Sequence, residues 1–222
     1  MSDHTLTCAN VYDARPATEV PAESPLAWSY QNTGRPSVSE KSRVVLRERA
    51  MLGHLILRGG AIVLDDAVRQ VLGLQLPGRP NALSHDESGE RSIQWLSPDE
   101  WLLIVPGGEE FELEQRLRDA LGDARDTAVK NYAIVNVGGG QTLVELEGEC
   151  VRELLMKSTP YDVHPDAFPV GKGVTTVFAK SNLILRRPTE DRWELVLRRS
   201  FADYLYRWLL DAGAEYAIGV EA

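Results

Sequence analysis

Hydrophobic residues recur along the chain at two spacings, one typical of strands and the other typical of helices. Acidic residues open both helices predicted in the first half, and a glycine follows each helix, as the helix dipole and the left-handed helix cap favour. The predicted elements are strands at 53–58, 93–96, 101–106 and 132–137 and helices at 65–72 and 109–121.

The same order of elements recurs in the second half. Its predicted strands cover residues 143–146, 174–179, 183–187, 193–197 and 216–220, and its helices cover 148–157 and 200–212. The last helix begins at Ser200, ends before Gly213 and places an apolar stripe toward the core. The stripe consists of Phe201, Leu205, Trp208, Leu209 and Ala212.

The two halves also share residues at equivalent places. Three pairs are each separated by 92 residues, namely Trp101 and Trp193, Leu113 and Leu205, and Leu117 and Leu209. We therefore expect an α+β fold of two repeated βαββαβ modules with mainly antiparallel sheets, packed as one globular unit. The first module covers residues 43–137 and the second covers 138–222.

Two predicted strands are apolar at successive positions rather than at alternate positions. Residues 101–105 and 183–185 place nonpolar side chains on both faces of their sheets. The two helices of a module cover only one face, and each exposed Å² of apolar surface costs about 25 cal/mol. We therefore expect the modules to pack on each other, on a partner chain, or on both.

Residues 1–42 form a segment of different composition. Prolines at 16, 21, 25 and 36 interrupt any regular period, which predicts an extended N-terminal arm. Leu26, Trp28 and Tyr30 stand at alternate positions and would gain from a surface that receives them. The sequence leaves a docked arm and a loose arm open.

The composition is that of a folded, acidic protein. The chain has 222 residues, of which 43% are hydrophobic, and a formal net charge of −9. This charge argues against nucleic acid and anionic membranes as partners, because both bind cationic surfaces. The chain shows no signal peptide and no run of about 18 apolar residues. Cys8 and Cys150 lack the spacing of a secreted disulfide scaffold, so we expect a cytoplasmic protein.

The sequence motifs of the commonest enzymes are missing. The chain contains no Gly-x-Ser-x-Gly, His-Glu-x-x-His, Cys-x-x-Cys or Gly-x-x-x-x-Gly-Lys-Ser/Thr sequence. Asp162, His164 and Asp166 could offer metal ligands, but nearby prolines indicate a surface loop and no further His or Cys cluster accompanies them. The glycines at 138–140 and 171–173 do not open a helix, which favours turns over an anion or dinucleotide site.

Two arginine pairs could bind an anion from the ends of neighbouring strands. They are Arg186-Arg187 and Arg198-Arg199, and acidic residues within 190–194 lie close enough in sequence to neutralise them. Salt-bridged or solvated arginines are therefore the favoured interpretation. His54 has no acidic partner in view and is predicted to be an ordinary strand side chain. We assign no catalytic, cofactor-binding or metal-binding residue to this chain.

Four separated blocks resemble one known family. The blocks are ERAMLGHL at 48–55, WLSPDEWLL at 95–103, DVHPDAFP at 162–169 and RRSFADYL at 198–205. They resemble the gamma subunit of heterotetrameric sarcosine oxidase, and the likeness runs from about residue 48 to 218. The N-terminal arm lies outside it.

The resemblance implies a noncatalytic subunit of an enzyme that converts sarcosine to glycine and hydrogen peroxide and passes the one-carbon unit to tetrahydrofolate. FAD, FMN, NAD and zinc are then expected on other subunits, with none of them on this chain. The alpha subunit is the expected neighbour, and beta and delta complete the complex.

The gamma fold is similar to part of the glycine-cleavage aminomethyltransferase, and residues 146–163 and 183–199 look like that relationship. The acidic residue that such transferases use near folate should fall around Ser181-Asn182, where no carboxylate stands. This departure argues against folate chemistry on the present chain.

Three hypotheses follow for the function. The first is a structural, assembly-promoting gamma subunit of sarcosine oxidase. The alternative is a free-standing tetrahydrofolate-dependent one-carbon transferase, which would bind tetrahydrofolate on its own. A third is a scaffold for an unrelated oxidoreductase.

Overall fold

The computed structural model describes residues 23–122 and 131–221. The strands are β1 (Val44–Arg49), β2 (Gly53–Gly59), β3 (Leu83–His85), β4 (Ser92–Ser97), β5 (Glu100–Val105), β6 (Tyr132–Asn136), β7 (Gln141–Glu147), β8 (Lys172–Phe178), β9 (Ser181–Arg187), β10 (Arg192–Arg198) and β11 (Ile218–Val220). The helices are α2 (Ala27–Asn32), α3 (Ala61–Leu72), α4 (Glu109–Leu121), α5 (Val151–Ser158) and α6 (Ala202–Ala212), with short 3-10 turns η1 (Arg199–Phe201) and η2 (Ala214–Tyr216). No helix within these two described ranges has the length and apolar character needed to span a membrane.

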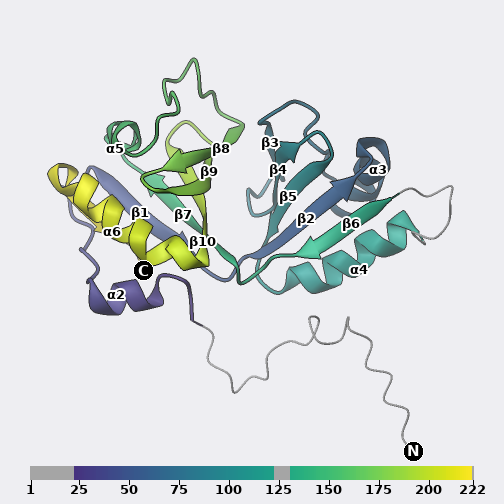
Figure 1. The fold of residues 1–222 in the computed structure, drawn as a ribbon, viewed down its shortest axis with the longest axis horizontal. Coiled ribbons are helices and arrows are strands. Elements are labelled where there is room, and N and C mark those ends of the chain that lie inside the picture. The colour runs from purple at the N-terminus through teal and green to yellow at the C-terminus, as the bar shows by residue number, and fades with distance from the viewer. Residues whose placement is uncertain (1–22, 123–130, 222) are drawn as a thin grey trace, which may run out of the picture.

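The first sheet has five strands in the order β3-β4-β5-β2-β6. Its paired strands are antiparallel throughout, and α3 and α4 lie over one of its faces (Figure 1). Leu55 and Leu103 from the sheet pack there against Leu64 of α3 and Leu117 of α4. The alternation of apolar residues along the strands and the helical stripes together build this core.

The second sheet has six strands in the order β11-β1-β7-β10-β9-β8. All its pairs are antiparallel except β1 with β11, which run parallel. Its core contains Leu146 and Leu195 from the sheet, Leu154 of α5 and Leu205 of α6. The two helices thus cover the outer face of this sheet (Figure 1).

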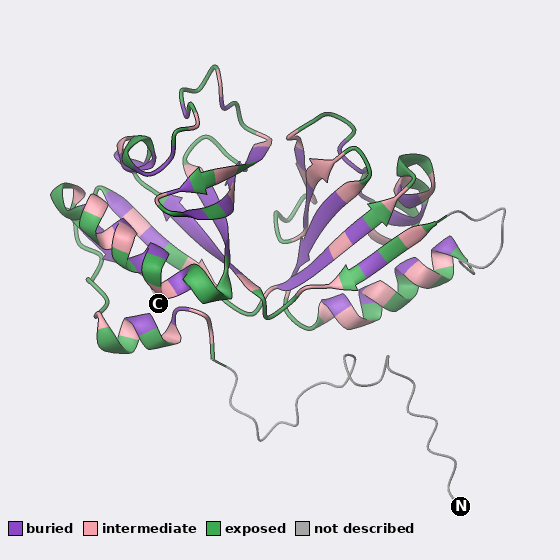
Figure 2. Cartoon of the chain, in the orientation of Figure 1, coloured by how far each residue is buried: buried purple, intermediate pink, exposed green. Residues whose placement is uncertain are grey.

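The remaining faces of the two sheets pack on each other. Leu102 and Ile104 of β5 meet Leu143 of β7 and Val196 of β10 in a third apolar cluster. The central strands β5, β7 and β10 are therefore buried along most of their length, whereas the edge strands and the outer sides of the helices keep exposed residues (Figure 2). The inner faces of the two sheets therefore cover each other, and the α+β class with mainly antiparallel sheets is confirmed. Packing on a partner chain stays a prediction.

The structure departs from the sequence prediction at β1, which the hydrophobic pattern did not identify. The predicted first module, residues 43–137, includes β1. In the structure, however, β1 pairs with β7 and β11 of the second sheet. Val44 and Leu46 are fully buried in that sheet's core, and a short strand pattern carries no information about its partner. The division into modules at residue 137 stays a prediction.

Helix α3 also begins earlier than predicted. The acidic residues at 65 and 66 were expected to open it, but α3 starts at Ala61 and its first turn holds no acid. Asp65 instead accepts a hydrogen bond from the backbone N–H of Leu76 at 2.8 Å and pairs with Arg69 at 2.7 Å. Its carboxylate therefore fixes the loop after the helix rather than the helix start.

The described part of the arm is docked, and it is not extended throughout. Residues Ala27–Asn32 form α2, whose Ser29 hydroxyl donates to Asp203 of α6 at 3.0 Å. Leu26 is buried, and the ring of Tyr30 packs edge-on against Tyr206 at 5.3 Å. An entirely extended arm is thus wrong for these residues, because a helical turn brings Leu26 and Tyr30 to one side. Residues 1–22 of the predicted arm lie outside the described ranges.

The hydroxyl of Tyr206 ties the arm to α6, and its removal tests the docking. It donates to the carbonyl oxygen of Gly34 at 2.7 Å. We expect Tyr206→Phe to lower the free energy of unfolding by about 1 kcal/mol, because the Gly34 carbonyl loses its partner. Urea denaturation measures the change. Tyr204→Phe on the same helix is the control and should leave stability unchanged, since Tyr204 is partly exposed.

Candidate functional site

A buried ion pair lies on the inner face of the second sheet. Arg186 of β9 and Glu194 of β10 are register partners, and the Arg186 Nε donates to the Glu194 carboxylate at 2.8 Å. Both side chains are at least nine-tenths buried. Arg192 lies 3.9 Å from the other carboxylate oxygen. The structure therefore confirms the salt-bridged interpretation of Arg186, because an eight-residue separation across a hairpin places the two charges opposite each other.

Two histidines from the first sheet lie near this pair. His54 of β2 is fully buried, and burial, with the nearby Arg186 charge, lowers its pKa to about 4. Its Nδ1 lies 3.0 Å from the carbonyl oxygen of Leu52, which can only accept, so Nδ1 carries the proton. Burial and Arg186 also lower the pKa of His85 in β3. His54 is thus a strand side chain, as predicted. Its low pKa keeps it neutral near pH 7.

Hydrogen bonds join the edges of the two sheets. The side-chain amide of Gln94 in β4 donates to the carbonyl oxygen of Gly173 in β8 at 3.0 Å. Nearby, the backbone N–H of Gly173 donates to Asn81 at 2.8 Å, and that of Leu83 donates to Gly171 at 2.8 Å. Gly171 and Gly173 therefore join the sheets. Gly171 lies in the predicted turn, but the turn prediction is wrong for Gly173, which lies within β8. A Cβ atom on Gly173 would collide with the Gln94 amide.

Substitution of Gly173 tests this seam, the contact between the edges of the two sheets at Gln94 and Gly173. We expect Gly173→Ala to lower the free energy of unfolding by about 1–3 kcal/mol, because the added methyl group displaces Gln94 from a packed position. Gly78→Ala is the control, since a Cβ there meets no atom within 4 Å. Thermal denaturation compares the two variants, and equal melting temperatures would contradict the seam.

A second charge cluster was not foreseen from the sequence. The carboxylate of Glu145 in β7 is buried and has Arg49 at 3.1 Å, Arg47 at 3.5 Å and Arg192 at 3.5 Å. Arg47 and Arg49 come from β1, almost 100 residues away in sequence. The cluster fixes β1 against β7, and no local signal could have revealed it.

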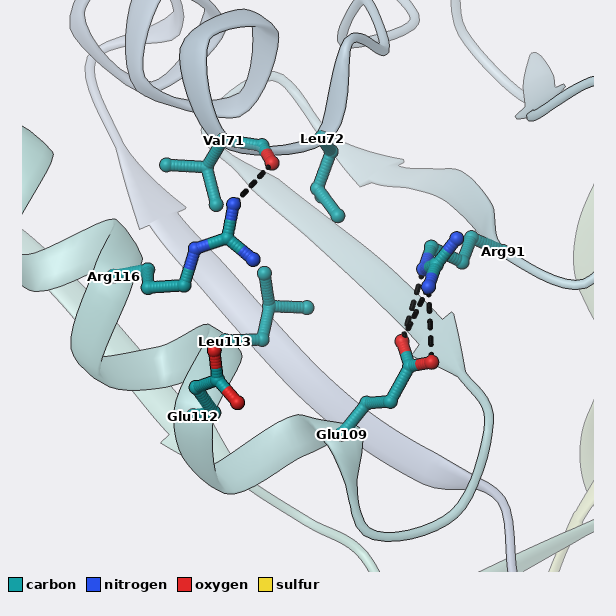
Figure 3. Close-up of a pocket in the computed structure, with 7 residues that line it drawn as sticks. All are labelled: Val71, Leu72, Arg91, Glu109, Glu112, Leu113 and Arg116. Carbon is teal, nitrogen blue, oxygen red and sulfur yellow. Dashed lines mark hydrogen bonds and ion pairs between the residues drawn. The ribbon is translucent and has the colours of Figure 1, made fainter.

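A hollow between α3 and α4 is lined by both acidic and basic side chains, as many binding sites are. It encloses about 360 Å³ and is lined by Val71, Leu72, Arg91, Glu109, Glu112, Leu113 and Arg116. The Arg91 guanidinium donates to both Glu109 oxygens at 2.8–3.0 Å, and Arg116 donates to the Val71 carbonyl at 3.0 Å (Figure 3). Both arginines are thereby used in joining α4 to its neighbours. Arg91 is therefore neutralised within the chain and Arg116 is tied to a backbone carbonyl, while the Glu112 carboxylate also lines the hollow (Figure 3).

The possible metal ligands in the loop at 162–166 do not converge. The Asp162 carboxylate accepts the backbone N–H of His164 at 2.9 Å, and His164 lies 3.5 Å from Asp166 with both side chains exposed. Across residues 23–122 and 131–221, no three His, Cys, Asp or Glu side chains are arranged to hold a metal ion. The first glycine run, 138–140, forms the link between β6 and β7.

The groove beside the β8–β9 turn contains the position at which the resemblance predicts an acidic residue. This hairpin groove encloses about 370 Å³ and is lined by Val177, Lys180, Ser181, Asn182, Arg198 and Phe201. Phe201 departs from the prediction, because the helical stripe placed it in the core whereas 40% of it is exposed. It belongs to the 3-10 turn η1, which precedes α6 and rotates the side chain off the helical stripe.

The architecture defines a class of protein. Two sheets packed face to face, with helices on their outer faces, are shared with the glycine cleavage system aminomethyltransferase T from Bartonella henselae. That match has a TM-score of 0.59 at 14% identity and covers 88% of this chain and 58% of that chain. The chain therefore has the aminomethyltransferase-like fold.

Within that class, the chain belongs to the sarcosine oxidase gamma subunit family. The family described as "Sarcosine oxidase, gamma subunit family" matches residues 59–215. The sarcosine oxidase subunit gamma of Corynebacterium sp. (strain P-1) is 33% identical over 184 residues, which covers 81% of this chain and 84% of that protein. The subunit gamma of an Arthrobacter species is 29% identical over 195 residues, covering 82% and 92% respectively.

A solved complex gives the same result in three dimensions. A chain of heterotetrameric sarcosine oxidase from Corynebacterium sp. U-96, in complex with pyrrole 2-carboxylate, matches with a TM-score of 0.75 at 29% identity. The match covers 90% of the present chain and 99% of that chain. The family resemblance inferred from the four sequence blocks is therefore confirmed.

Proposed function

We propose that this chain is the noncatalytic gamma subunit of a heterotetrameric sarcosine oxidase, and that it acts by packing against a larger subunit and supporting assembly. The relatives named above are subunits of that enzyme. Oxidation of sarcosine would then be an activity of the complex.

The observation that carries the noncatalytic assignment is the burial of the inner-face polar groups between the two sheets. Arg186 is paired with Glu194, and His54 stays neutral near pH 7 because its pKa lies at about 4. Leu102 and Leu143 fill the neighbouring space between the sheets. These groups hold the two sheets together, and a general base or an anion site would require them to face a substrate.

The residue at position 182 supports the same assignment. Asn182 is an amide where the resemblance to aminomethyltransferases predicts an acidic residue near folate. Lys180 and Arg198 line the same groove, which therefore contains no carboxylate to receive a proton or bind a pterin ring. We infer that another subunit handles tetrahydrofolate.

The expected cofactors and partners follow from this role. FAD, FMN, NAD and zinc would be held by other subunits, with alpha as the main neighbour of this chain and beta and delta completing the complex. We infer a cytoplasmic location, because Cys150 is a buried free thiol and suits a reducing compartment.

Co-expression with the other subunits tests the proposal. Native mass spectrometry should find this chain in a complex that oxidises sarcosine, and the isolated chain should be colourless. Titration calorimetry of the isolated chain with tetrahydrofolate should show no binding. A yellow isolated chain, or one that binds tetrahydrofolate, would favour the free-standing transferase. Assembly into a complex that does not oxidise sarcosine would favour the scaffold of another oxidoreductase.

A further inference from the structure

The hairpin groove exposes large apolar side chains to water. Val177 is 47% exposed and Phe201 is 40% exposed, although both are large apolar side chains in a folded region. Tyr204 lies three residues beyond Phe201, near the start of α6, and is partly exposed as well. Such side chains gain free energy when a second surface removes them from water. The inner faces of the sheets, by contrast, already cover each other.

The groove is also cationic in an acidic protein. Lys180 and Arg198 are exposed and line it together, and no carboxylate is among its lining residues. The register neighbour of Arg198 in β7 is the neutral Gln141. On α6, Asp203 is held by Arg207 at 3.0 Å. The two cations therefore form a local positive field on a chain whose net charge is −9.

We propose that the hairpin groove binds a segment of another subunit in which carboxylates flank an apolar side chain. The proposal rests on the proposed function, since it requires a subunit complex. The carboxylates pair with Lys180 and Arg198, and the apolar side chain packs on Val177 and Phe201. Arginine and aromatic side chains are enriched at the centres of protein interfaces, where charge pairs select the partner. A nucleic acid would be attracted by the two cations but would leave Val177 and Phe201 exposed to water. The net negative charge of the chain would also repel it.

The experiment uses the complete complex with substitutions in this chain. The variants are Phe201→Ala and Arg198→Glu, and the matched controls are Ile62→Ala and Arg79→Glu on the other half of the molecule. Ile62 and Arg79 are both exposed, and the charge change at 79 equals that at 198. We expect each groove variant to raise the dissociation constant of this chain from the complex roughly tenfold or more. The controls should stay within about twofold of the unsubstituted chain.

A photo-crosslinking side chain at position 177 identifies the occupant directly. We expect it to capture a peptide of another subunit that contains Asp or Glu next to apolar residues. Capture of residues 1–22 of this chain, or of a second copy, would overturn the proposal, as would groove variants whose dissociation constants equal those of the controls. In these cases the unsubstituted chain still assembles and the proposed function stands. Failure of the unsubstituted chain to join the complex would instead overturn the proposed function.

Discussion

Replacing Arg186 by leucine is expected to lower the free energy of unfolding by about 3–5 kcal/mol. Glu194 would then remain buried without its closest counter-ion. Arg192 lies 3.9 Å from the other Glu194 oxygen and compensates only in part, which places the effect toward the lower end of that range. Urea denaturation at pH 7 measures the loss. The slope of the unfolding free energy against urea concentration should be the same for the variant and the unsubstituted chain.

A second variant separates lost charge pairing from lost packing. Arg186→Leu combined with Glu194→Leu removes both charges and should regain most of the stability, because apolar side chains of similar volume often replace a buried pair at little cost. Arg69→Leu is the surface control, since the Arg69 side chain is about half exposed, and we expect a loss of less than about 1 kcal/mol. Similar losses for Arg186→Leu and Arg69→Leu would show that the buried pair is dispensable.

His54 is expected to make the folded chain sensitive to mild acid. Its pKa falls from 6.5 to about 4 on folding because burial disfavours the charged ring. Below pH 6.5 the unfolded chain therefore takes up a proton that the folded chain does not. The contribution of His54 to stability is therefore constant above about pH 6.5 and decreases as the pH falls toward 4. The difference between the two pKa values corresponds to about 3 kcal/mol.

The measurement compares variants rather than absolute stabilities, because carboxylates also titrate below pH 5. His54→Asn keeps a side-chain donor for the Leu52 carbonyl and removes the titrating ring. The difference in unfolding free energy between the unsubstituted chain and His54→Asn should change by about 3 kcal/mol from pH 7 to pH 4. A pH-independent difference for His54→Asn would refute the burial argument.

Local patterns predicted most elements because their signals lie within about a dozen residues. The hairpin of β4 and β5 and the helix at Glu109–Leu121 follow from alternation, turn residues and a helical stripe. The Arg186–Glu194 pair was accessible for the same reason, since one turn separates the two strands. The aminomethyltransferase-like fold came from the resemblance rather than from these patterns.

Features that depend on distant segments could not be read from the sequence. The contact of Glu145 with Arg47 and Arg49 joins strands that are almost 100 residues apart in sequence, and both sets of charges look like ordinary surface residues in sequence. Phe201 fits the helical stripe by spacing alone, but the 3-10 turn before α6 moves it onto the surface. The hairpin groove was missed for that reason, because its lining comes from a turn, a strand end and a helix start.

The position of β1 has a consequence for the order of folding. Val44–Leu46 precedes every other described strand, yet one of its neighbours is Ile218–Val220 at the far end of the chain. During synthesis, β1 must therefore remain without this neighbour until the last strand is made, while β2 to β6 can pair earlier. Contacts of such long separation are formed late and slowly. Ribosome-bound chains should accordingly present an open β1 edge to chaperones until residues 218–220 have been synthesised.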